Sequence, residues 1–267
     1  MTTDKVAAPL SLILPYFQVE DWDRVRPVMA EFDSKATSLG IRKTNWTVSC
    51  DNCLAFRATL DTHMDVSEFF DHFSPLIDKM VASGGATINA LTVYGPPKHA
   101  EDMKKKLSET KPYADYLEFV QDGYFSNVNI WDPLPNTTVI VQAHYTINDF
   151  KTVSPRMQEI IDKTRDEEGV RFFDWHITEN VEGGKLVCHG EFENGASVAS
   201  HYSNVNQDLE VLLKKAASMD KIELHGSKQE VLASRKATSK LKKLFKGVLV
   251  HEYFSDVEED LVYVREF

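Results

Sequence analysis

The chain has 267 residues and an ordinary globular composition, with 42% hydrophobic and 27% charged residues. It carries 30 lysines and arginines against 41 aspartates and glutamates, so its net charge is −11. An acidic chain without a dense basic stripe is a poor candidate for binding nucleic acid. No apolar run approaches the length of a membrane span, and three cysteines supply no disulfide framework. We therefore expect a cytoplasmic protein that binds neither nucleic acid nor membrane.

The two halves of the chain repeat each other in sequence. Asp21 matches Asp149, 128 positions later, and Trp46 matches Trp175 after one inserted residue. Other identities are Val25/Val153, Pro27/Pro155, Gly40/Gly169, Arg42/Arg171, Leu54/Leu186, Val66/Val198, Gly95/Gly226 and Tyr124/Tyr253. A register held over so much of the chain indicates a duplicated domain.

The hydrophobic pattern predicts the same order of elements in both halves. In the first half the predicted strands are 12–17, 42–48, 54–60 and 88–94, and in the second they are 139–145, 171–178, 186–192 and 221–225. Asp21 and Asp149 can each cap a helix that follows the first strand. A second apolar stripe at helical spacing begins at Val66 or Val198. A charged helix and a short strand around Tyr124 or Tyr253 end each half.

The order strand, helix, strand, strand, helix, strand is that of the ferredoxin-like α+β fold, in which both helices cover one face of an antiparallel sheet. We expect the first repeat to span 9–125 and the second to span 138–258. The stretch between them, 126–137, is rich in proline and asparagine and is predicted to be a linker. Since each sheet has one face without helices, we expect the two sheets to pack face to face.

In element order and length, this duplicated sequence resembles the dimeric α/β barrel superfamily, close to the antibiotic-biosynthesis-monooxygenase-like domains. The resemblance implies an intramolecular dimeric α/β barrel built from two tandem repeats. It also implies an enzyme that deprotonates and positions an aromatic substrate for reaction with dioxygen, without metal or flavin. We expect a small-molecule substrate; pairing of two chains into a homodimer is left open.

Strand alternation sorts the second repeat into two sheet faces. The set expected under the helices is Val139, Val141, Ala143, Phe173, Trp175, Leu186, Cys188, Ile222 and Leu224. The opposite set is Gln142, His144, Asp174, His176, His189, Glu191, Glu223 and His225. The matching positions of the first repeat are Leu14, Tyr16, Asn45, Thr47, Arg57, Thr59, Thr92 and Tyr94. Four of the nine histidines thus fall on one face, and both sets are expected to line one cavity.

Three interpretations of this face remain open, because burying it without partners would be costly. The first is a polar interface in a non-catalytic ligand-binding or stress-associated barrel. The second is a site for a metal ion held by His144, His176, His189 and His225, or for haem as in chlorite-dismutase-like proteins. The third is a substrate cavity.

The leading interpretation is a substrate cavity without a cofactor. His176 or His189 would act as the general base, with Asp174 as the third catalytic residue. The expected ligand-binding residues are Tyr16, Asn45, Arg57, Tyr94, Gln142, His144, Glu191 and His225. Trp46 and Trp175 are expected to be core anchors, and His201, which replaces Phe69 on a helix stripe, a core histidine with a partner.

Overall fold

The computed structural model describes residues 11–41, 43–60, 66–95, 117–125, 136–177, 183–244 and 248–255. The chain divides into two compact units. The N-terminal unit is built from Ala8–Phe119 and the C-terminal unit from Val120–Asp256. Of the expected linker, only its last two residues lie among those described, where they form an exposed turn.

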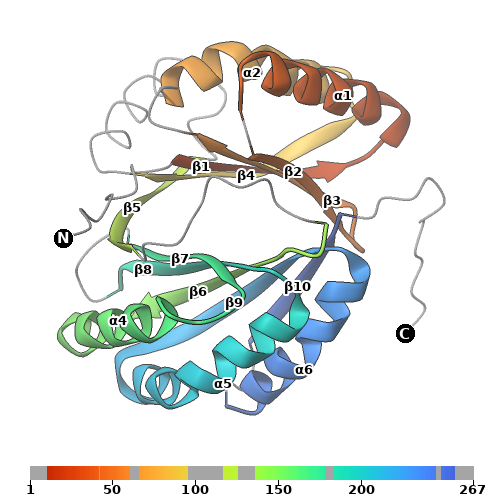
Figure 1. Ribbon diagram of the computed structural model, residues 1–267. Coiled ribbons are helices and arrows are strands. Elements are labelled where there is room, and N and C mark those ends of the chain that lie inside the picture. Colours follow the sequence, from red (N-terminus) through yellow and green to blue (C-terminus); the bar gives the residue numbers. More distant parts are fainter. Residues whose placement is uncertain are drawn as a thin grey trace, which may run out of the picture. The chain divides into compact units, whose positions relative to one another are not determined.

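The N-terminal unit is an antiparallel sheet with two helices on one side (Figure 1). Its elements are β1 (Ser11–Val19), α1 (Trp22–Ser38), β2 (Lys43–Ser49), β3 (Cys53–Leu60), α2 (Val66–Ala82) and β4 (Ala86–Gly95). The strands lie in the order β2-β3-β1-β4. This is the predicted order of elements.

Local signals in the sequence account for the ends of these elements. The Asp21 carboxylate accepts a hydrogen bond from the backbone of Asp23 and caps α1. The β2–β3 hairpin turns at Asn52, whose φ of 58° is one that asparagine tolerates better than most residues. Between the sheet and its helices, Phe32, Phe56 and Phe73 form the centre of an aromatic core.

The C-terminal unit repeats this plan and adds strands at both edges. Its elements are β5 (Leu117–Phe125), β6 (Val139–Ile147), α4 (Phe150–Thr164), β7 (Val170–Ile177), β8 (Lys185–Phe192), α5 (Gly195–Val211), a π-helical turn (Leu212–Ala216), β9 (Ala217–Gly226), α6 (Lys228–Leu244) and β10 (Leu249–Phe254). The strands lie in the order β10-β9-β6-β8-β7-β5. In Figure 1, α4, α5 and α6 all cover the same face of this sheet.

The two edge strands differ in their partners. β10 pairs in parallel with β9, so the strand around Tyr253 completes the half to which it belongs in sequence. The strand around Tyr124, expected at the end of the first half, has Trp175 of β7 as its antiparallel neighbour. Without β5, β7 would be an edge strand with free backbone hydrogen-bond donors and acceptors. Pairing with β5 provides partners for these groups.

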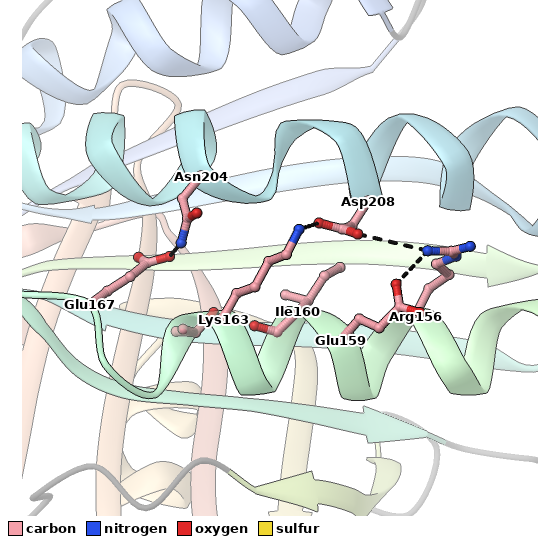
Figure 2. Close-up of polar contacts among 8 residues, drawn as sticks. Arg156, Glu159, Ile160, Lys163, Glu167, Asn204 and Asp208 are labelled. Carbon is pink, nitrogen blue, oxygen red and sulfur yellow. Dashed lines mark hydrogen bonds and ion pairs between the residues drawn. The ribbon is translucent and has the colours of Figure 1, made fainter.

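Polar contacts join α4 to α5 on the side away from the sheet. Lys163 Nζ lies 2.5 Å from an Asp208 carboxylate oxygen, and Arg156 Nη1 lies 3.8 Å from the other. Figure 2 shows these contacts, with Glu159 also beside Arg156 and with Asn204 donating to Glu167. Asp208 is only 6% exposed, so two cations compensate a nearly buried charge.

The predicted assignment of the two sheet faces in the C-terminal unit is confirmed. All residues expected under the helices belong to one buried core, with Val153, Met157, Tyr202 and Leu209 from the helices. His201, expected to be a core histidine with a partner, is 3% exposed, and its Nδ1 lies 2.9 Å from Glu167. None of the helices described has the length and apolarity that a membrane crossing requires.

Candidate functional site

The polar side chains predicted on the second repeat lie on the sheet face opposite the helices of the C-terminal unit. All are buried apart from His144, whose side chain is 19% exposed. Strand register places one row of them side by side across four strands: Asp174, His189, Gln142 and Glu223. Ile140 and Val187 lie two residues before Gln142 and His189 on the same strands and point to the same face, so this face is not wholly polar.

Asp174 and His176 form a buried pair on β7. Two residues apart on one strand, they point to the same side of the sheet. His176 Nε2 lies 2.9 Å from Asp174 Oδ1, and both side chains are 3% exposed. This is the distance of an ion pair, although the two atoms are not aligned as a hydrogen bond.

His189 lies next to this pair on β8. Its ring centroid is 6.5 Å from that of His176. The side-chain amide nitrogen of Gln142 lies 3.2 Å from His189 Nδ1, and His189 Nε2 lies 3.7 Å from Glu191. With the amide donating, Nδ1 is the acceptor and the ring proton of neutral His189 is on Nε2.

Glu223 on β9 gathers the remaining histidines. Its carboxylate lies 3.3 Å from His144 Nε2 and 3.9 Å from His225 Nε2, while Lys221 Nζ lies 2.8 Å from its other oxygen. Burial opposes ionisation of Glu223, but the two imidazoles and the Lys221 charge outweigh it and hold the pKa of Glu223 well below its usual range. This part of the face therefore contains a permanent carboxylate surrounded by cationic or protonatable groups.

Sequence reasoning missed three contributors to this face. Lys221 precedes Glu223 by two residues on the same strand, which was the available signal for their ion pair. The Tyr253 ring stacks on His225, with centroids 4.5 Å apart and planes at 6°. Phe172 contacts His189, with centroids 5.6 Å apart.

The histidines are not arranged around a common point. Among the described residues, no three His, Cys, Asp or Glu side chains gather closely enough to hold a metal ion. Each of the four histidines expected as alternative ligands instead faces a carboxylate of its own or a neighbouring strand. The residues present do not fit the alternative metal site.

The expected ligand-binding residues of the first repeat lie in the N-terminal unit. Tyr16 and Arg57 are each 7% exposed, and Asn45 is the direct cross-strand neighbour of Arg57. Tyr94 is in β4, and its side chain lies outside the described part of the chain. A cavity shared by both repeats would join the two units, and it stays a prediction.

The chain is similar to known proteins in structure and not in sequence. No protein-family model and no curated protein sequence matches the chain. A proposed monooxygenase from Fusobacterium nucleatum subsp. nucleatum is similar with a TM-score of 0.50 and 12% identity, over 81% of this chain and 94% of that one.

Two further structures are similar at lower scores. A proposed monooxygenase from Lactobacillus acidophilus has a TM-score of 0.49 and 10% identity, over 80% of this chain and 91% of that one. A proposed chlorite dismutase has a TM-score of 0.45 and 13% identity, over 80% and 91%. At such identities a match shows architecture and leaves the chemistry to the residues of this chain. With its duplicated α+β units and a match over most of both chains, the protein shares its fold with the Fusobacterium structure, in agreement with the predicted dimeric α/β barrel class.

Proposed function

We propose that the protein is a small-molecule oxidoreductase of the monooxygenase type, acting on an aromatic or anionic substrate without a metal or organic cofactor. The observation that carries this proposal is the buried pair of Asp174 and His176, which lie 2.9 Å apart on a face that also holds His189. A buried carboxylate and imidazole in contact form the usual arrangement of a general base with its orienting group.

His176 takes the role of the base. Its Nε2 faces Asp174, so its Nδ1 is the atom that receives a proton from a phenolic hydroxyl or an acidic carbon–hydrogen bond. The Asp174 charge stabilises the imidazolium that forms. Removal of the proton leaves an electron-rich anion, which is the species that reacts with dioxygen. One oxygen atom enters the substrate, and the other leaves as water with the two hydrogens that the substrate loses.

His189 is the second proton carrier of the proposal. Its ring is close to that of His176, and Gln142 and Glu191 hold it from both sides. A second imidazole allows the site to return a proton to reduced oxygen while His176 is still protonated.

Substrate binding is assigned to the remaining predicted residues. His144, His225 and Lys221 surround Glu223, and they favour a substrate that develops negative charge. From the N-terminal unit, Tyr16, Asn45, Arg57 and Tyr94 are proposed to orient the substrate. The shared fold with a proposed monooxygenase agrees with this assignment as an analogy of architecture.

The test is a screen of phenols, quinols and anthrones for oxygen uptake in the presence of the protein. A compound that the protein oxidises is then offered to the Asp174→Asn and His176→Asn variants. We expect losses of about 10²–10⁴-fold in kcat for His176→Asn. Full activity in both variants would remove the proposed base.

Elemental mass spectrometry and an absorbance scan of protein purified without a histidine tag test the cofactor-free part of the proposal. The expected result is a metal-free protein without a Soret band. Stoichiometric metal or haem would replace the proposal by a cofactor-dependent oxidation on the same face.

A further inference from the structure

The cores under the two sheets differ at matched positions. In the N-terminal unit aromatic rings fill the space: Phe32 lies 5.4 Å from Trp46 and 5.1 Å from Phe73, and Trp46 lies 4.4 Å from Phe56, all between ring centroids. The C-terminal unit keeps the tryptophan, as Trp175, but replaces the phenylalanines by smaller or more polar residues. The replacements are Phe17 by Tyr145, Phe32 by Ile160, Phe56 by Cys188, Phe69 by His201, Phe70 by Tyr202 and Phe73 by Val205.

The two tryptophans also differ in their hydrogen bonds. Trp46 Nε1 donates to the carboxylate of Asp33 on α1, at 2.9 Å. The position that matches Asp33 is Ile161, a fully buried aliphatic residue on α4. Trp175 is 1% exposed, and among the described residues its Nε1 has no hydrogen-bond partner. A buried indole N–H without a partner is costly, so an acceptor bound beside it would stabilise this core.

A small cavity lies beside Trp175 in the core of the C-terminal unit. Its lining is mainly apolar, and Tyr145, Trp175, Cys188, His201 and Tyr202 are the lining residues that carry a polar group. The space inside it that is open to a water molecule is about 10 Å³, which is close to what one water molecule requires. Tyr145 and Tyr202 are 1% and 9% exposed, so their hydroxyls lie within the protein.

We propose that this cavity binds one water molecule, which accepts the hydrogen bond of Trp175 Nε1 and is held by the hydroxyls of Tyr145 and Tyr202. An internal water usually makes two to four hydrogen bonds to buried polar groups that lack other partners. The indole and the two tyrosine side chains line the same cavity, so their polar groups can provide that number. The water takes over the role that Asp33 performs for Trp46 in the N-terminal unit.

The chemistry of the lining favours an uncharged ligand. Burial raises the pKa of the Tyr145 and Tyr202 hydroxyls, so both are neutral donors at neutral pH. Burial and the Asp174 charge raise the pKa of Cys188, which keeps the thiol protonated and also opposes entry of an anion. His201 Nδ1 lies 2.9 Å from Glu167, so this side chain already has a polar partner that is not part of the cavity lining.

The position of the water has a structural consequence for the polar face. Trp175 lies between Asp174 and His176 on β7, and Cys188 precedes His189 on β8. The bound water therefore supports, from the helix side, the two strands that carry the proposed bases. The inference stands on the core alone and does not depend on the proposed function.

Oxygen-17 magnetic relaxation dispersion, which counts long-lived internal waters in solution, tests the proposal on the full chain. The double variant Tyr145→Phe, Tyr202→Phe restores the residues found in the N-terminal unit and leaves the water one strong partner. We expect it to lose one long-lived water relative to the unmodified protein. The matched control Trp46→Phe changes the other tryptophan, whose partner is Asp33, and should keep the count. An unchanged count in the double variant would overturn the proposal.

A crystal structure that resolves ordered waters gives a second test, which does not require a variant to fold. The expected result is density for one water within about 2.7–3.2 Å of Trp175 Nε1. A dry cavity, or an indole that donates to a protein group, would contradict the inference.

Discussion

The two units of this protein share a plan and differ on both faces of the sheet. Asn45 and Thr47 of the N-terminal unit correspond to Asp174 and His176 of the C-terminal unit. Under the helices, a phenylalanine cluster corresponds to a core that contains tyrosine, cysteine and histidine. The N-terminal unit thus specialises in packing, while the C-terminal unit accumulates titratable groups. Duplication permits this division because each half has a hydrophobic core of its own.

The largest effect that can test this comparison concerns activity. On the proposed function, His176→Ala with His189→Ala removes both proton carriers and should lower kcat by about 10⁴-fold or more. Thr47→Ala with Arg57→Ala, in the N-terminal unit, should mainly raise KM, because it affects substrate orientation. Steady-state kinetics with a substrate from the oxygen-uptake screen separates the two results. Equal losses of kcat from both pairs would end the assignment of chemistry to the C-terminal unit.

The next largest effect concerns the two cores. Phe56→Ala should lower the free energy of unfolding by about 3–5 kcal/mol, because a large ring leaves the aromatic cluster. Cys188→Ala at the matching position removes one sulfur beside an existing cavity and should cost about 1 kcal/mol. Urea unfolding followed by fluorescence and circular dichroism measures both variants. Similar costs would show that the cores do not differ as their residues indicate.

Acid sensitivity should belong to the C-terminal unit. The pKa of Glu223 is depressed, so the stabilisation from its charge is complete above its ordinary value of 4.5 and is lost as the pH falls toward the lower folded value. Glu223→Gln should cost about 3 kcal/mol at neutral pH, since it leaves cationic partners without their carboxylate. Below pH 4.5 the free energy of unfolding of this variant should also fall less steeply with decreasing pH than that of the unmodified protein.

The matching residue in the N-terminal unit, Thr92, carries no charge and supplies the control. Thr92→Ala should leave the acid slope of the unfolding free energy unchanged. Urea midpoints over a pH series distinguish the variants. An acid slope in Glu223→Gln as steep as in the unmodified protein would place the sensitivity elsewhere.

The smallest effect concerns the contacts between the helices of each pair. Asp208→Ala removes a nearly buried carboxylate held by Lys163 and Arg156 (Figure 2) and should cost about 2 kcal/mol. Glu31→Ala breaks an exposed ion pair with Lys79 across α1 and α2 and should cost about 0.5 kcal/mol or less. Thermal unfolding at low and high salt measures the difference. A larger cost for Glu31→Ala would reverse the comparison.

The order of elements was predictable from the sequence, but some boundaries were not. The fourth strand of the second half was predicted at 221–225, whereas β9 spans Ala217–Gly226. A register shift opposite His144 and Tyr145 interrupts β9, so Ala217 and Met219 lie in the same core as Ile222 despite their spacing. An irregularity of this kind breaks the alternation on which the prediction depends.

The members of the polar face were predictable, but their pairing was not. Alternation placed His144, His189 and Glu223 on one face because side-chain direction in a strand has a period of two residues. The contact of His144 with Glu223 and of Gln142 with His189 depends on how strands far apart in sequence align. The contact of Lys221 with Glu223 is likewise set by the structure, because alternation gives the side of the sheet and not the distance between two side chains.

The sequence by itself determined the duplication, the order of the elements and the two faces of the second sheet. These properties follow from local periodicity and from the match between halves, and both can be read without knowing which residues meet. Only the tertiary structure decided that Trp46 donates to Asp33 whereas Trp175 faces a small cavity. The same is true of the pairing of each histidine with its carboxylate. Such contacts depend on strand register and helix packing, which bring together residues that no local pattern connects.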